Sequence, residues 1–193
     1  MNTTSGERYT EIVDTAKKLF RKKNYHGTSM QDIAEKVGIY RGSLYHYINS
    51  KEEILYHIVE RPVLKGFESL KKIQEEDLPP IQKLRRAIEY HVRDSMEHQA
   101  ELAILLEDTK HLSEKYQNQI REVQKKYEGT FLSIIKEGIK KGDFKKLDPK
   151  IVTFAVFGMT NWMYRWYDTD GLLSAEEIAE IFLDMIFNGL SHK

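Results

Sequence analysis

Apolar side chains recur every three or four positions along most of this 193-residue chain. That spacing places them on one face of an α-helix, and it repeats from the N-terminus to the C-terminus. The pattern therefore predicts an all-α protein of about nine helices. The expected helices cover residues 7–23, 28–37, 40–47, 52–75, 81–99, 100–110, 112–141, 149–167 and 174–190.

Residues 28–51 have the pattern of two short helices joined by a tight turn. Thr28 or Ser29 can cap the first helix, and Gly38 follows it where a left-handed backbone is needed. A second helix that leaves polar, aromatic and basic side chains outward is typical of a helix-turn-helix, which reads the DNA major groove. The inward apolar positions are Ala34, Val37, Ile39, Leu44 and Ile48.

The second helix of this pair is short and rich in side chains that cannot all be buried. Arginine can bond guanine O6 and N7 together, so Arg41 is the best candidate for a specific base contact. At least one tyrosine is expected to serve packing instead, and Tyr47 is the candidate. The outward set is Tyr40, Arg41, Ser43, Tyr45, His46 and Tyr47.

Charge is divided unevenly along the chain. The whole sequence is neutral, with 30 basic and 30 acidic residues. Residues 1–51 contain nine Lys and Arg against five acidic residues, a balance of +4, which leaves 21 against 25, or −4, for the rest. This asymmetry favours a basic DNA-reading domain joined to a body that does not bind DNA.

The composition excludes several other classes. The chain has no cysteine, so disulfide frameworks and thiolate metal sites are ruled out. We expect a cytoplasmic protein without a membrane partner, because the start lacks a secretory pattern and no apolar run reaches the roughly 18 residues that span a bilayer. There is no nucleophile elbow, phosphate-binding glycine loop or HExxH motif, so we expect neither an enzyme, nor a bound cofactor, nor a metal site.

Three motifs resemble the TetR family of one-component transcriptional repressors: YHGTSM at 25–30, GSLYHY at 42–47 and SKEEIL at 50–55. The resemblance implies a dimer on a pseudo-palindromic operator, because one helix-turn-helix reads only half a site. It also implies phosphate contacts from Thr28 or Ser29 and from Lys51. At base edges or nearby backbone it implies Gln31, Tyr40, Arg41, Gly42, Ser43 and Tyr45, with His46 and Tyr47 at phosphate or in packing.

The family pattern divides the chain into a DNA-binding domain, 1–51, and a ligand-binding and dimerisation domain, 52–193. Helix 52–75 would be the connector, either kinked or broken at Pro62. The last two helices, about 149–167 and 174–190, resemble the pair that forms the family's dimeric four-helix bundle. Ser174 and Glu177 form a capping box at the start of the second of these helices, whose expected apolar stripe is Ile178, Ile181, Phe182, Met185 and Ile186.

The run FGMTNWMYRWYDTDGLLSAEEIAEIF, residues 157–182, resembles the branch of these repressors that senses acyl-CoA thioesters. The resemblance implies release from the operator by a long-chain acyl-CoA, with an arginine between indoles at the pocket or its mouth. An alternative buries both indoles at the dimer interface and pairs Arg165 with Asp168 or Asp170. The expected ligand contacts are His91, Met96, Leu105, Tyr127, Phe131, Trp162, Arg165 and Trp166.

Two further alternatives stay open on the sequence. The protein is a repressor of an efflux pump if the pocket instead takes hydrophobic, often cationic drugs, for which Glu107 and Asp108 would supply acidic groups. His91 and His98 lie seven positions apart on one helical face, yet a shared metal would need ligands from another helix. We expect His91 to be buried and hydrogen-bonded beside the ligand pocket.

Overall fold

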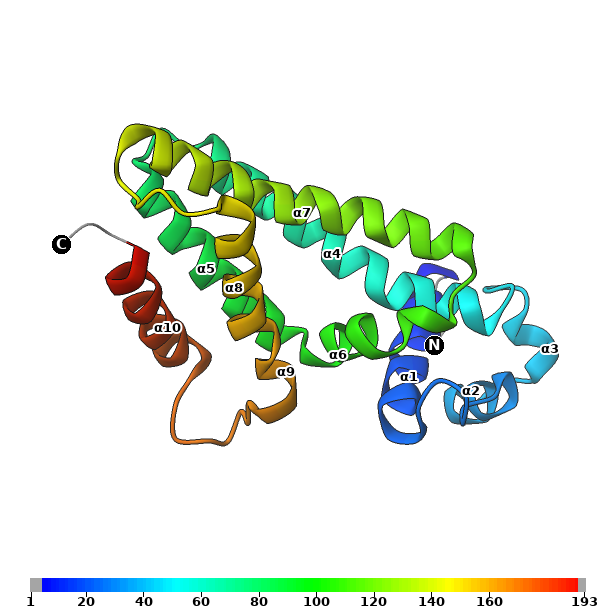
Figure 1. The fold of residues 1–193 in the computed structure, drawn as a ribbon. Coiled ribbons are helices and arrows are strands. Elements are labelled where there is room, and N and C mark those ends of the chain that lie inside the picture. The colour runs from blue at the N-terminus through cyan, green and yellow to red at the C-terminus, as the bar shows by residue number, and fades with distance from the viewer. Residues whose placement is uncertain (1–4, 191–193) are drawn as a thin grey trace. The chain divides into compact units, whose positions relative to one another are not determined.

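The computed structural model describes residues 5–190, and of Leu190 only the backbone. Among these residues it contains ten α-helices and one 3₁₀ turn, with no β-strand (Figure 1). The all-α prediction is confirmed. In chain order the elements are α1 (Ser5–Lys23), α2 (Met30–Val37), α3 (Arg41–Leu44), α4 (Lys51–Glu75), α5 (Pro80–Glu97), α6 (Gln99–Glu107), η1 (Thr109–His111), α7 (Glu114–Lys141), α8 (Pro149–Asn161), α9 (Met163–Trp166) and α10 (Ala175–Leu190).

The chain forms two compact units. The first contains the chain up to Pro62 together with Ala100–Ile120, and the second contains Val63–Gln99 together with the chain from Arg121 onward. The first unit is therefore discontinuous in sequence, since α6 and η1 belong with α1, α2 and α3.

Apolar side chains from all parts of the first unit share one core. The amphipathic spacing of α1 brings Ile12, Ala16 and Phe20 to its inner face, and all three are buried. Segment 100–120 adds Ile104, Leu112 and Ile120 to the same cluster. The fully buried residues from α2, α3 and the start of α4 are Ile33, Ala34, Leu44, Ile54 and Leu55.

In the second unit, α5 packs against both α8 and α10. The capping box of α10 is present: the Glu177 amide donates to Ser174 Oγ over 3.2 Å, and the Glu177 carboxylate accepts from the Ser174 amide over 2.8 Å. The apolar stripe predicted for α10 is only partly covered within one chain. Ala175, Ile178, Ala179 and Leu183 are buried, whereas Ile181 and Met185 are 48% and 60% exposed.

Two predicted helices are shorter or broken in the structure, and a third runs unbroken through a proline. Helix α3 ends at Leu44 rather than at residue 47, because the chain enters a turn after one helical turn. The helix predicted over 149–167 breaks at Trp162 into α8 and α9. Pro62 does not interrupt α4, which continues through it to Glu75.

Candidate nucleic-acid interface and effector site

Helix α2 is fixed at both ends by local hydrogen bonds. Ser29 is its N-cap: its hydroxyl accepts from the Asp32 amide, while the Asp32 carboxylate accepts from the Ser29 amide. Lys23 lies 2.7 Å from the same carboxylate, and these hydrogen bonds lower the pKa of Asp32 well below its usual range. Gly38 ends the helix with a φ of +79°, a conformation that glycine adopts without strain. The turn between α2 and α3 is therefore specified by local sequence.

Helix α3 presents an exposed polar face, as the sequence predicts. Leu44 is fully buried beneath it, while Tyr40 is 87% exposed and Tyr45 is 43% exposed. The Arg41 guanidinium lies 3.5 Å from the Tyr45 hydroxyl, so the two polar groups are neighbours on the surface. Gly42 and His46 are exposed as well, whereas Tyr47 packs against the core, as expected for the packing tyrosine.

Thr28 and Lys51 hold the unit together internally. The Thr28 side chain is buried, and its hydroxyl donates to the Asn24 carbonyl over 3.0 Å. The Lys51 ammonium donates to the carbonyls of Tyr25 and Thr28, and it lies 4.3 Å from the centroid of the Tyr25 ring. Sequence reasoning missed this role, because a lysine after a turn gives no sign of which carbonyls it will meet. Ser29 and Gln31 remain exposed on the same unit.

His91 lies at the centre of a buried polar group in the second unit. Its Nδ1 lies 2.7 Å from the Tyr127 hydroxyl and its Nε2 lies 3.1 Å from Asn161 Oδ1. Burial lowers the pKa of His91 to about 4, so the ring is neutral at pH 7. Nε2–H then donates to Asn161, and Nδ1 accepts from Tyr127. The buried, hydrogen-bonded His91 that the sequence predicts is confirmed.

Aromatic rings surround this polar group. The Phe131 ring centroid lies 5.9 Å from that of His91, and the Phe157 centroid lies 5.1 Å from it. Met96 is also buried on α5. Phe157 and Asn161 were missed by sequence reasoning, although their four-residue spacing on one helix puts both on the same face. Predicted contacts from α5 and α7 thus converge on α8.

The other predicted ligand contacts lie elsewhere. Trp162 and Trp166 are 57% and 48% exposed in the single chain, which leaves their burial at a dimer interface untested. The Arg165 guanidinium lies over the Trp162 ring at 5.3 Å, and its Nε donates to the Tyr164 hydroxyl. Leu105 belongs to the first unit and packs against the core of that unit.

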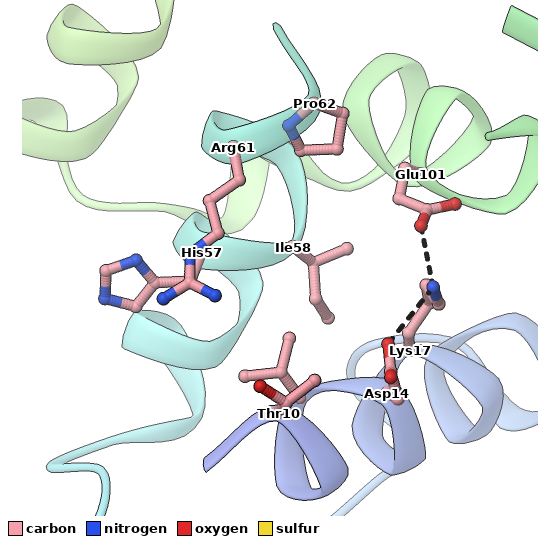
Figure 2. A pocket seen from close by; sticks show the side chains of 9 residues that line it. Thr10, Asp14, Lys17, His57, Ile58, Arg61, Pro62 and Glu101 are labelled. Atoms are coloured by element: carbon pink, nitrogen blue, oxygen red, sulfur yellow. Dashed lines mark hydrogen bonds and ion pairs between the residues drawn. The ribbon is translucent and has the colours of Figure 1, made fainter. Parts of the chain in front are cut away.

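A pocket of about 120 Å³ lies between α1, α4 and α6 within the first unit (Figure 2). Lys17 lies beside it, 2.6 Å from the Glu101 carboxylate and 3.3 Å from that of Asp14. Two acidic partners already neutralise this ammonium. The pocket contains none of the predicted ligand contacts, and it is smaller than the roughly 300 Å³ at which drug-sized ligand sites begin.

Residues 5–190 hold neither a metal-binding cluster nor a membrane-spanning helix. No group of three or more His, Asp or Glu side chains in this range is placed to hold a metal ion. No helix in the same range is both long enough and apolar enough to cross a bilayer.

A capped helix, a left-handed glycine turn and a short exposed helix define a helix-turn-helix DNA-binding regulator with a helical body. Residues 12–58 match the family described as bacterial regulatory proteins, tetR family, and residues 77–190 match the tetracyclin repressor-like C-terminal domain. The chain belongs to the TetR family, whose members are regulators rather than enzymes.

Individual relatives extend over nearly the whole chain. The HTH-type transcriptional repressor KstR2 of Rhodococcus jostii is 29% identical, covering 97% of this chain and 94% of its own. The TetR family regulator PfmR of Thermus thermophilus is 34% identical with a TM-score of 0.86, covering 94% of this chain and 99% of its own. AibR, solved with isovaleryl coenzyme A and operator DNA, is 30% identical with a TM-score of 0.84, covering 94% and 98%.

Proposed function

We propose that this protein is a transcriptional repressor that binds a pseudo-palindromic operator as a homodimer and is released by an acyl-CoA thioester. The observation that carries the DNA-binding part is the exposed face of α3, where Arg41 and Tyr45 are adjacent above a buried Leu44. Ser29, Gln31 and the backbone at Gly42 and Ser43 would complete the DNA contacts, with His46 at phosphate. Residues 1–51 are assigned to DNA reading and residues 52–193 to effector binding and dimerisation, with 52–75 as the connector.

Thr28 and Lys51 have fewer polar groups free to contact DNA than the sequence suggests, because both make hydrogen bonds inside the unit. The Thr28 hydroxyl is already used internally, which favours Ser29 as the phosphate contact near the start of α2. Two of the three N–H donors of the Lys51 ammonium are used on backbone carbonyls, so one donor is left for DNA.

The effector proposal rests on the group around His91. An aromatic cluster with a few convergent polar atoms is the usual make-up of a small-molecule site. His91, Tyr127 and Phe131 supply that combination in this chain, with Met96 beside them on α5. Trp162, Arg165 and Trp166 would lie at the mouth, where the guanidinium is placed to meet a carbonyl or phosphate. AibR, which resembles this chain over 94% of its length, was solved with isovaleryl coenzyme A.

Dimerisation is assigned to α8 and α10. Both helices leave large apolar side chains exposed, which is unusual unless a partner covers them. On α8 these are Ile151 and Phe154, at 63% and 47% exposure, and on α10 they are Ile181 and Met185. Two copies of this surface related by a two-fold axis would form the four-helix bundle.

One release experiment tests the effector class. The operator is first selected from random duplexes with the purified protein, and its dissociation is then followed by fluorescence anisotropy. Isovaleryl-CoA, lauroyl-CoA and oleoyl-CoA are compared with free coenzyme A and with ethidium, a hydrophobic cation. Release by an acyl-CoA but not by free coenzyme A is expected. Release by ethidium alone would replace this proposal with a drug-sensing efflux repressor, and failure to select any duplex would contradict DNA binding itself.

A further inference from the structure

Two histidines far apart in sequence meet in the first unit. His26 lies in the turn before α2, and His111 ends η1. His26 Nε2 lies 3.0 Å from His111 Nδ1, and the two ring centroids are 4.1 Å apart. This pair therefore joins the DNA-binding region to segment 100–120. Helices α4 and α5 separate the two stretches in the sequence.

The pair is held in place by Tyr25. The His111 ring stacks on Tyr25 at an interplanar angle of 7°, and His26 meets the same ring edge to face. Lys51 reaches the Tyr25 ring as well and bonds the Tyr25 and Thr28 carbonyls. The histidine pair thus lies next to the segment that sets the start of α2.

Charged side chains from η1, its preceding residue and α4 lie near the pair. On its own segment, His111 faces Asp108, whose carboxylate is 3.9 Å from Nε2, and Lys110. Helix α4 contributes Lys51, whose charge acts on His111, and Glu52, whose charge acts on the Tyr25 hydroxyl. Nearby cations disfavour a second positive ring, and Asp108 offsets them only in part.

A nitrogen-to-nitrogen distance of 3.0 Å requires one ring to donate and the other to accept. The contact therefore exists while at least one imidazole is neutral. When both rings are protonated, both nitrogens become donors and two like charges face each other. Burial, together with the charges of His26 and Lys110, lowers the pKa of His111 and so disfavours that state.

We propose that His111 is a positioning residue for DNA binding, and that the His26–His111 pair holds the turn before α2 until both rings are protonated. This inference rests on the proposed operator binding. Because His111 binds its proton less readily in the closed pair, the pair keeps its full stability above the ordinary histidine pKa of about 6.5. That stability falls as the pH drops below this value, and operator affinity falls with it.

The predicted sign is opposite to the simple charge effect. Protonated histidines add positive charge to a DNA-binding surface, so acid pH alone should tighten binding. A general gain of positive charge therefore cannot explain weaker operator binding at acid pH.

The test compares operator dissociation constants at pH 7.5 and pH 5.5 at fixed ionic strength. For the unchanged protein we expect the dissociation constant to rise at pH 5.5, because the pair loses its hydrogen bond when both rings are protonated. His111→Phe keeps a flat ring against Tyr25 but cannot titrate, so its profile should be flat or reversed. His26→Gln, at an exposed position, should behave in the same way. His98→Gln, outside the first unit, is the matched control and should keep the same rise as the unchanged protein.

Equal pH profiles for all four proteins would overturn the proposal. NMR provides an independent measurement: the chemical shifts of the histidine rings are followed against pH in the free protein, without operator. The His111 signal is expected to titrate below pH 6.5, and a His111 midpoint at or above 6.5 would overturn the inference. A protein whose His111 signal titrates below pH 6.5 but that binds no duplex at pH 7.5 would contradict the proposed function instead.

Discussion

His91 is the residue whose chemistry is most altered by the fold. Its ring is buried among Tyr127, Phe131 and Phe157, and two hydrogen bonds satisfy both nitrogens in the neutral form. Adding a proton would remove the acceptor that faces Tyr127 and place a charge in an apolar environment. The second unit should therefore be sensitive to acid at this position.

We expect the free energy of unfolding to fall as the pH drops from 7 to 4. The pKa of His91 is lowered from 6.5 to about 4, so its contribution is complete above about pH 6.5 and is lost toward pH 4. The loss should be about 3 kcal/mol. Urea unfolding at both pH values measures it, and His91→Gln, which keeps a polar side chain but does not titrate, is the control. An equal loss in the variant would show that other groups are responsible.

Arg41 is expected to give sequence specificity. Arg41→Ala should weaken operator binding by about 1 to 3 kcal/mol and relax selection at one base position. Arg41→Lys keeps the charge but cannot make two parallel bonds to guanine, so it should lose specificity while keeping non-specific affinity. Competition binding with operator and random duplexes separates the two effects. If the lysine variant keeps full specificity, Arg41 contacts phosphate rather than a base.

At the scale of the element, helix ends are set by side chains near in sequence. Ser174 and Glu177 bond each other's amides at the start of α10, as their spacing predicts. Ser174→Ala should therefore destabilise the protein by about 0.5 to 2 kcal/mol. Ser174→Thr keeps the hydroxyl and serves as the matched control in thermal unfolding. Equal melting temperatures for the two variants would mean that the cap contributes nothing.

Contacts between residues near in sequence could be predicted from the sequence, whereas contacts between distant residues could not. Gly38 and Ser29 act within a few residues, so their roles follow from local rules. Periodicity places Ile181 and Met185 on the apolar stripe of α10 but does not tell that one chain leaves both side chains exposed. The contact between His26 and His111 joins residues 85 positions apart, and no local pattern reports it. The break at Trp162 likewise lies inside an uninterrupted apolar run.

For the whole molecule, assembly is the property that decides function, because a single helix-turn-helix reads only half a site. Met185→Glu places a charge on the exposed apolar face of α10, and the two-fold axis would introduce it twice. We expect dimerisation and operator affinity each to weaken by more than about tenfold. Light scattering and anisotropy measure the two properties.

Ile81→Glu is the matched control, since Ile81 is 39% exposed on α5. It should leave the molecular mass in solution unchanged. A dimer that persists in Met185→Glu but dissociates in Ile81→Glu would move the interface from α10 to α5.

The discontinuous first unit has a consequence for exchanging parts between related regulators. Ile104, Leu112 and Ile120 complete the core beneath α1 and α2, although they come from the far side of α5 in the sequence. A DNA-binding domain taken from this chain by cutting after residue 51 or 75 would lack these side chains. Its apolar face would then be exposed to solvent. A chimera that recognises a new operator therefore needs two inserts, one from each stretch of the chain. A single crossover would combine the α1 and α2 core residues of one protein with the segment 100–120 of another, and the two sets of side chains would not be matched in packing.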